Sequence, residues 1–291
     1  MIRWNNYRNN KKQDLRKQGC SKKKYSISLI ISTYNSDKML RLCLHSVARQ
    51  TILPNEVIVA DDGSTEETKR CVDLMRTIIK CPVKHVWQRD DGFQLSKIRN
   101  KAIAIAECDY IIQIDGDLIL DKHFVEDHLN HAKKRFLSAG SRCLLTKGKT
   151  NEVMGKEHYS PHWFSLGIKS RENGVRIPFL THFLKRGKRV LGCNMAFFRS
   201  DIVAINGYNE NLTGWGHEDL ELKQRMINSG MRVQRIKFCA VTFHLWHSER
   251  SRNNEQSHFQ LVGEEKKKKV TRIDNGIDKY ISSKETITIL E

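Results

Sequence analysis

The chain has 291 residues, of which 39% are hydrophobic and 29% charged, and its formal net charge is +18. This composition is typical of a globular protein, and no apolar run reaches the roughly 18 residues that would predict a membrane-spanning helix. The basic N-terminus lacks the apolar stretch of a secretory signal, and the eight cysteines are scattered without a CxxC pair. We therefore expect a cytoplasmic protein with reduced thiols and no zinc ribbon.

The positive charge is concentrated in two segments. Residues 1–24 contain nine Lys or Arg and one Asp, and residues 133–190 contain fourteen Lys or Arg and three acidic residues. A basic surface favours an anionic partner, and composition leaves open whether this is nucleic acid, an acidic membrane face or a phosphorylated substrate. A solvated surface without a partner is the remaining interpretation.

After the basic leader, continuous apolar runs alternate with segments of helical periodicity. The predicted strands are 26–32, 55–60, 82–88 and 109–114, and the predicted helices between them are 36–49, 65–80 and 96–107. This alternation predicts an α/β fold with a doubly wound sheet.

The second half of the chain is less regular. Segment 133–190 is basic, contains several aromatic residues and lacks a clean periodicity, so we expect an inserted, mobile region beside the ligand crevice. A strand-like run follows at 190–200, a helix is expected to end near residue 229, and 232–249 reads as strand and turn. The tail from residue 250 is polar, and it includes a KKKK run.

Polar residues follow each of the four predicted strands, where doubly wound sheets bind their ligands. They are Thr33-Tyr34-Asn35, Asp61-Asp62-Gly63-Ser64, Arg89-Asp90-Asp91-Gly92 and Asp115-Gly116-Asp117. No GxGxxG follows the first strand and no GxxxxGK[ST] occurs, which disfavours a dinucleotide fold and a P-loop. A metal held by the aspartates would neutralise a phosphate in place of a glycine-rich loop.

Two short motifs carry residues that bind metals. Asp115 and Asp117 flank a glycine at a strand end, so their oxygens can meet at one divalent cation that bridges a diphosphate. His244 and His247 belong to HLWH, and a His-x-x-His turn can converge on a metal. A histidine taken alone is more often structural, but the DxD motif in the same chain favours a metal site.

Residues 214–222 read GWGHEDLEL and precede a predicted helix. Capping of the helix dipole accounts for Glu218 and Asp219 in the first turn. It leaves the glycines on either side of Trp215 unexplained.

The motifs STYN, VADDGS, DGFQLSKIRN and DGD, in this order and spacing, resemble family-2 glycosyltransferases with the GT-A fold. The block INGYNENLTGWGHEDLELKQRM…VTFHLWHSER…NNE is similar to the C-terminal half of the β-1,4-galactosyltransferases and to chondroitin-polymerase-type bacterial enzymes. The resemblance covers about residues 26–260. It implies a mixed doubly wound sheet flanked by helices, in a single Rossmann-like domain with an inserted acceptor-side region.

The domain organisation follows from this resemblance. The expected units are a flexible basic leader (1–24), a glycosyltransferase domain (25–260) and a basic tail (261–291). Within the domain we expect a nucleotide-sugar half (25–132), the basic insert (133–190), and an acceptor and catalytic half (191–260).

The resemblance also implies roles for individual residues. The nucleotide-sugar would be bound by Thr33, Tyr34, Asn35, Asp61, Arg99, Asp115 and Gly116, with Asp61 accepting a hydrogen bond from uracil. The expected metal ligands are Asp117, His247, His244 and Asp115. The sugar site would comprise Trp215, Gly216, His217 and Glu218, with Asp219 as the catalytic base beside Glu218. His217 stands where the family usually has a second glycine.

The implied activity is inverting and metal-dependent transfer of a hexose or N-acetylhexosamine. The donor would be a UDP-sugar, the cofactor Mn²⁺ or Mg²⁺, and the acceptor a hydroxyl of a glycan or lipid-linked molecule in bacterial surface polysaccharide or lipopolysaccharide synthesis. We expect a cytoplasmic enzyme with peripheral contact to an anionic inner membrane face and no nucleic-acid partner.

Two alternatives compete with this interpretation. A nucleic-acid-binding protein built on the insert and leader would leave the strand-end aspartates unexplained, although basic and aromatic residues do mix in the insert. A catalytically inactive sugar-binding scaffold is disfavoured by the presence of Asp117, Asp219 and His247. The sequence does not name the donor sugar, the acceptor or the oligomeric state.

Overall fold

The structure is a computed structural model, and it describes residues 25–156, 159–181, 190, 192–214, 216–248 and 255–291. The leader 1–24 and Trp215 lie outside the described residues. No helix in the described ranges is both long and apolar enough to cross a membrane.

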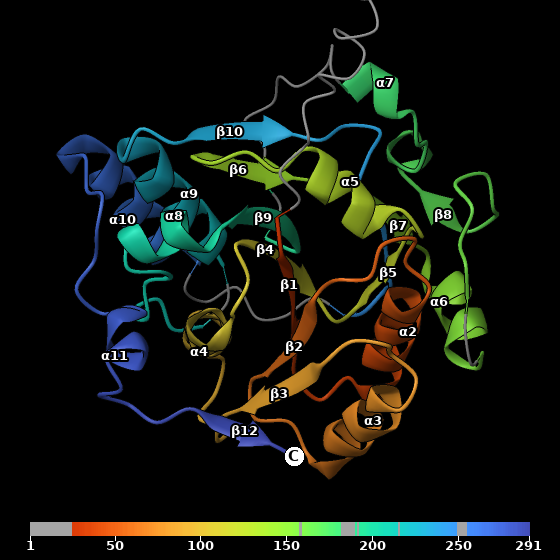
Figure 1. The fold of residues 1–291 in the computed structure, drawn as a ribbon. Coiled ribbons are helices and arrows are strands. Elements are labelled where there is room, and N and C mark those ends of the chain that lie inside the picture. The colour runs from red at the N-terminus through yellow and green to blue at the C-terminus, as the bar shows by residue number, and fades with distance from the viewer. Residues whose placement is uncertain (1–24, 157–158, 182–189, 191, 215, 249–254) are drawn as a thin grey trace, which may run out of the picture.

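An eight-stranded mixed sheet forms the centre of the molecule (Figure 1). Its strands, in spatial order, are β10 (Arg232–Arg235), β6 (Phe136–Ala139), β9 (Asn194–Phe198), β4 (Tyr110–Asp115), β1 (Ile27–Thr33), β2 (Glu56–Asp61), β3 (Val83–Trp87) and β12 (Thr288–Leu290). Strands β4, β1, β2 and β3 are parallel neighbours, whereas β9 and β12 run antiparallel to the strands beside them. The predicted α/β fold with a mixed, doubly wound sheet is confirmed.

Helices cover both faces of this sheet, and together they enclose two cores. The helices are α2 (Asp37–Ala48), α3 (Glu66–Arg76), α4 (Leu95–Ile105), α5 (Phe124–Asn130), α6 (Lys147–Met154), α7 (Pro178–Thr181), α8 (Arg199–Ala204), α9 (Glu218–Asn228), α10 (Glu255–Lys268) and α11 (Asp278–Ile281). In β1, Leu29 and Ile31 pack with α2 and α3, while Ile30 packs with α4 and α9 on the other face. Because alternate side chains enter opposite cores, the central residues of the strand, Leu29–Ile31, are all apolar.

A second sheet of four strands lies beside the first. Its order is β5 (Leu118–Leu120), β11 (Val241–His244), β7 (Ser141–Leu145) and β8 (Ile168–Lys169). The β5 strand follows β4 after a turn that contains Gly116 and Asp117, and β11 pairs with both β5 and β7. This pairing brings the C-terminal end of β11 next to the end of β4.

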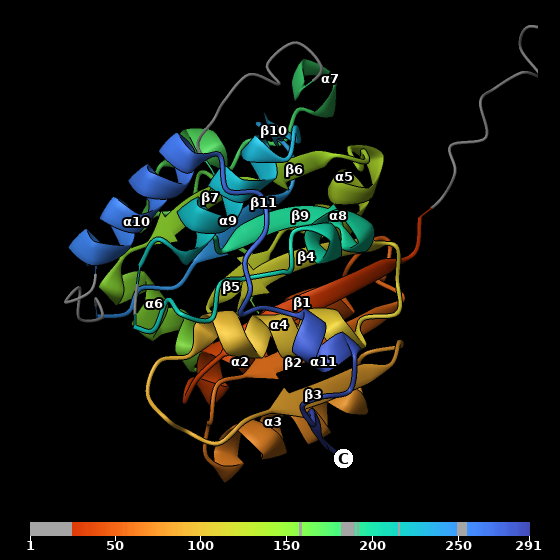
Figure 2. The ribbon, with the colours of Figure 1, turned by 90° about the vertical axis from the view of Figure 1, so that its left-hand side faces the viewer.

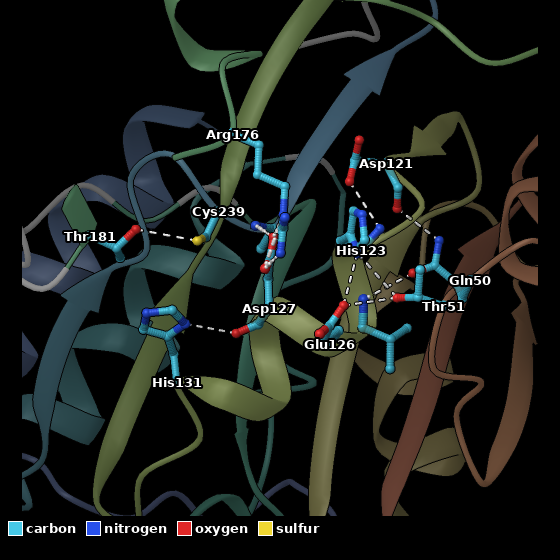
Figure 3. A network of polar contacts seen from close by, with 12 residues as sticks. Gln50, Thr51, Asp121, His123, Glu126, Asp127, His131, Arg176, Thr181 and Cys239 are labelled. Atoms are coloured by element: carbon cyan, nitrogen blue, oxygen red, sulfur yellow. Dashed lines mark hydrogen bonds and ion pairs between the residues drawn. The ribbon is translucent and has the colours of Figure 1, made fainter. Parts of the chain in front are cut away.

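The segment expected to be an insert is joined to both sheets. Its β6 strand pairs with β9 and β10, and β7 and β8 form half of the second sheet. Figure 3 shows a further attachment, in which Arg176 makes a bidentate ion pair with Asp127 of α5, with Nη2–Oδ1 at 2.6 Å and Nε–Oδ2 at 2.9 Å. Asp127 also accepts a hydrogen bond from the backbone N–H of Ala240, just before β11. The described part of the segment is therefore built into the fold rather than set apart from it.

The C-terminal residues likewise contribute to the fold. Figure 2 shows α10 lying along α9, and α11 next to α4. Strand β12 then extends the large sheet by pairing with β3. The sequence did not predict this, because a three-residue edge strand leaves almost no periodic signal.

Candidate active site

A pocket of about 690 Å³ opens at the C-terminal ends of the parallel strands. Residues from both sheets and from the start of α9 form its wall. Those expected from the sequence are Thr33, Tyr34, Arg99, Asp115, Gly116, Asp117, Gly216, His217, Glu218, Asp219, His244 and His247. The structure thus brings together residues up to 214 positions apart in the chain (Thr33 to His247).

Three of these residues form a cluster suited to a metal ion. The ligand atoms of Asp117, His244 and His247 all lie within 4.8 Å of one another. The Oδ2 atom of Asp117 is 3.1 Å from Nε2 of His247 and 3.4 Å from Nε2 of His244. The other carboxylate oxygen of Asp117 is buried and has no hydrogen-bond partner among the described residues. One carboxylate and two imidazoles suit Mn²⁺ or a similar divalent ion, so the residues fit the expected metal.

The protonation states in this cluster favour metal binding. Burial by itself would raise the pKa of Asp117, but the hydrogen bond to His247 and the nearby charges of His244, His247 and Arg142 lower it below its ordinary value. Burial lowers the pKa of His244, although Asp117 opposes this shift. An ionised carboxylate and a neutral imidazole are the forms that coordinate metals.

Asp115, a further expected ligand, is not part of this cluster. Its Oδ1 accepts a hydrogen bond from Nη2 of Arg99 at 2.9 Å. The Arg99 side chain, 1% exposed, also donates from Nη1 to Glu218 at 3.3 Å and from Nε to Ser32 at 3.3 Å. One buried guanidinium therefore connects β1, β4 and the start of α9.

The neighbouring Asn100 has a structural role. Its amide donates to the backbone carbonyl of Tyr208 at 2.8 Å and accepts from the Tyr208 N–H at 2.7 Å. The IRN motif thus presents Arg99 to the pocket and uses Asn100 to hold the turn that precedes the GWGHED block.

The backbone geometry of GWGHED explains its glycines. Gly214, Gly216 and His217 have φ values of 84°, 114° and 66°, all in the region that favours glycine. His217 precedes the first residue of α9 and adopts a left-handed conformation. The family's glycine at this position is therefore the conformationally preferred residue, and the histidine is accommodated at some cost.

The two acids that follow occupy the first turn of α9 and make different contacts. Glu218 faces Arg99, and burial raises its pKa, with Arg99 opposing and Asp219 reinforcing the shift. Asp219 Oδ2 accepts the backbone N–H of Gly192 at 2.8 Å. Successive helix residues point about 100° apart, so the two carboxylates reach different parts of the same pocket.

Asn35 and Asp61, two of the expected nucleotide-binding residues, are not in the pocket wall. Asp61 accepts hydrogen bonds from the Ser64 N–H and, at 2.8 Å, pairs with His85 Nε2 beneath the strand end. The pocket is instead lined by Asp62, which accepts from Gln88 and from the backbone N–H of Gln94. The carboxylate of Asp61 is thus held beneath the strand end, whereas Asp62 lines the pocket.

Sequence reasoning missed other residues of the wall. Arg142 of β7 and Cys193 at the start of β9 line the pocket, together with Phe93 and Met39. The sequence did not predict Arg142 as a pocket residue because it belongs to the segment without periodicity. Its position in the pocket wall depends on the pairing of β7 with β11.

Comparison with known proteins agrees with this architecture. The model of glycosyl transferase family 2 matches residues 28–204, and a model described as the N-terminal domain of galactosyltransferase matches residues 180–248. Chondroitin synthase from Escherichia coli is 28% identical over 250 residues, which are 75% of this chain and 34% of that protein. This chain therefore spans about a third of the length of that relative.

Solved structures share the fold. The structure of S. aureus TarS 1–349 in complex with UDP superposes with a TM-score of 0.54 at 18% identity, covering 89% of this chain and 70% of that one. GalNAc-T7 with UDP, GalNAc and Mn²⁺ gives a TM-score of 0.59 at 16% identity, covering 83% of this chain and 48% of that one. Since the family model covers more than half of the chain, this protein belongs to glycosyl transferase family 2.

Proposed function

We propose that this family-2 glycosyltransferase is an inverting, metal-dependent enzyme that moves a hexose or N-acetylhexosamine from a UDP-sugar to a hydroxyl of a glycan or lipid-linked acceptor. The observation that carries the proposal is that one pocket contains both the Asp117–His244–His247 cluster and the Glu218–Asp219 pair. The first suits a diphosphate-bound cation and the second suits the activation of a hydroxyl. The bound UDP of the TarS structure and the UDP, GalNAc and Mn²⁺ of the GalNAc-T7 structure support the choice of donor and metal.

In the proposed reaction Asp219 is the general base. Its Oδ2 is held by the Gly192 N–H, and Oδ1 makes no hydrogen bond to the described residues, so Oδ1 is available for the acceptor hydroxyl. The acceptor oxygen attacks the anomeric carbon while its proton passes to this carboxylate. No second catalytic acid is required, because a diphosphate leaves readily once its charge is neutralised.

The metal ligands in this proposal are Asp117, His244 and His247. When bound, a divalent cation supplies positive charge to the diphosphate leaving group. Asp115 is not proposed as a ligand, since Arg99 holds its carboxylate. It remains positioned at the pocket wall, where it suits the ribose of the nucleotide.

Arg99 and Glu218 have a positioning role between the two halves of the site. The guanidinium fixes Glu218 at the pocket wall, and Glu218 is thereby placed to bind a sugar hydroxyl. His217 narrows the same wall where a glycine would leave space, so we assign it a part in selecting the sugar. Its ring lies 5.6 Å from that of Phe259 on α10.

The acceptor is proposed to be a growing glycan or a lipid-linked saccharide of a bacterial surface polymer. The chondroitin synthase relative supports a glycan acceptor, and the charge of the basic segment 133–190 supports contact with an anionic membrane face. The donor sugar itself has to be found by experiment.

The deciding experiment is a panel of UDP-sugars tested for Mn²⁺-dependent hydrolysis and transfer. We expect hydrolysis of at least one UDP-hexose or UDP-N-acetylhexosamine, lost with EDTA and restored by Mn²⁺. In His247→Ala the affinity for Mn²⁺, measured by calorimetry, should fall at least about tenfold, while His162→Ala, an exposed histidine outside the pocket, should leave it unchanged. Absence of hydrolysis with every UDP-sugar, together with absence of UDP binding, would refute the proposal.

A further inference from the structure

Arg142 is a pocket-lining cation that the reaction described above does not use. Among the described residues its guanidinium makes one hydrogen bond, from Nη1 to Sγ of Cys193 at 3.3 Å, and no ion pair. Arg99, in the same wall, is by contrast fully buried and paired with two carboxylates. A partly buried guanidinium that lacks a carboxylate is well suited to receive an anion from a ligand.

The location of Arg142 is fixed by strand pairing. On β7 it is in register with Thr242 of β11, and His244 follows two residues later on the same face of the sheet. The contact with Cys193 places the guanidinium next to Gly192, whose N–H holds Asp219. Arg142 and Asp117 also line the same pocket. Arg142 therefore lies between the metal cluster and the proposed base.

The reaction generates negative charge in this region. The bond from the acceptor oxygen to the anomeric carbon forms, and the bond from that carbon to the β-phosphate oxygen breaks. The hydroxyl proton passes to Asp219, and the electron pair of the broken bond stays on UDP, which becomes more negative by one charge. A divalent ion does not fully neutralise a nucleoside diphosphate, so a second cation near the leaving oxygen stabilises the products and the transition state.

We propose that Arg142 binds the β-phosphate of the departing diphosphate and is the second positive charge at this leaving group. The inference rests on the proposed function, because it requires a nucleoside diphosphate in the pocket. The planar guanidinium of Arg142 can donate two parallel hydrogen bonds to phosphate oxygens, which an ammonium group cannot do. Cys193 acts as a positioning residue, since its sulfur accepts from one nitrogen of this guanidinium.

Calorimetric binding of UDP and of UMP, in Mn²⁺ and in EDTA, tests this assignment without turnover. In Arg142→Gln the Kd for UDP should rise about tenfold to hundredfold, as expected for a lost charge-assisted contact. The Kd for UMP, which has no β-phosphate, should change less than about twofold. Arg142→Lys should recover part of the UDP affinity. Lys169→Gln, an exposed charge on β8 outside the pocket, controls for net charge and should bind UDP like the wild type.

The outcomes separate the inference from the proposed function. If wild-type protein binds UDP and folded Arg142→Gln, checked by thermal unfolding, binds it equally well, the assignment of Arg142 is wrong. If the variant instead shows unchanged UDP affinity and a raised KM only for acceptors that carry a carboxylate, Arg142 recognises the acceptor and the inference is again overturned. Failure of the wild type to bind UDP at all would refute the proposed function itself.

Discussion

His217 and Asp219 lie two residues apart at the start of α9, but different requirements constrain them. His217 has a left-handed backbone, and no periodicity in the sequence reveals such a conformation. Asp219 is held by a backbone N–H from residue 192, so its orientation depends on a contact across the fold. At the residue scale, the sequence motifs predict which residues belong to the candidate site. The backbone and side-chain conformations of these residues depend on tertiary contacts.

The role of Asp219 is tested by Asp219→Asn. Asparagine keeps the shape of the side chain but cannot accept the acceptor proton, so kcat for transfer should fall about 10²- to 10⁴-fold. The Kd values for UDP and Mn²⁺, measured by calorimetry, should stay within about twofold of wild type. Glu264→Gln, an exposed acid on α10, is the control for charge. Normal turnover by Asp219→Asn would exclude Asp219 as the base.

The strained backbone of His217 gives a stability prediction. His217→Ala retains a Cβ at φ 66°, whereas His217→Gly removes it. The glycine variant should therefore be more stable than the alanine variant by about 1 kcal/mol in urea unfolding. Comparison of these two variants separates the backbone effect from the loss of the contact with Phe259. An alanine variant as stable as the glycine variant would show that the conformation is not strained.

At the scale of elements, α9 and α10 are joined by an unusual group of charges. Glu221 and Arg225 of α9 form a fully buried ion pair with Nε–Oε1 at 2.6 Å. Glu265 of α10 packs beside them, and burial raises its pKa to about 7, reinforced by Glu221 and opposed by Arg225. The same helix contacts the pocket wall, because His258 Nδ1 donates to the backbone carbonyl of Gly216 at 2.7 Å.

This group predicts that stability falls as pH rises. The pKa of Glu265 in the folded state lies above its ordinary value of 4.5, so the folded protein binds the proton more tightly than the unfolded chain. The contribution of protonated Glu265 to the stability of the folded protein is fully present below about pH 4.5 and is lost as the pH rises through about 7. We expect the free energy of unfolding of Glu265→Gln to fall less between about pH 5.5 and about pH 8 than that of the wild type, as measured by urea unfolding at both pH values. Glu264→Gln should keep the wild-type pH dependence, and equal slopes in all three proteins would contradict the assignment.

The predictability of the elements depended on their burial. Strands β1, β2 and β4 were predicted because both faces enter a core and each strand contains a run of consecutive apolar residues. Strand β6, with its short run Phe136–Ala139, and β12 were not, since short strands at or near an edge have no such pattern. The motifs likewise predicted Asp117 and His247 as ligands of one metal, and the structure places the two side chains in contact. The position of Asp62 rather than Asp61 in the pocket wall, and the pairing of Arg99 with Asp115, required the packed structure.

At the scale of the whole molecule, the basic segment 133–190 presents apolar as well as charged side chains. Phe164 and Leu166 are 62% and 83% exposed, and Lys169 and Arg171 are exposed nearby in the chain. Charged and aromatic residues together suit the headgroup region of an anionic membrane.

Binding to liposomes tests this surface. Wild-type protein should bind vesicles with about 30% anionic lipid more tightly than neutral vesicles, because each Lys or Arg near an anionic surface contributes about 1 kcal/mol to binding. This binding should weaken as the salt concentration rises. Lys169→Glu combined with Arg171→Glu should weaken binding at least about tenfold. The matched pair Lys266→Glu and Lys267→Glu on α10 should have a smaller effect. If binding does not depend on salt and is unchanged in the Lys169→Glu, Arg171→Glu variant, this surface is not the membrane-binding site.

The buried contacts of Arg99 have a consequence for how this enzyme can change over evolutionary time. Arg99 is neutralised from one side by Asp115, at the end of β4, and from the other by Glu218, at the start of α9. Loss of either acid leaves an uncompensated charge at a fully buried position. Substitution at position 218 is therefore expected to be tolerated best together with a change at position 99 or 115, so these three positions should vary as one unit.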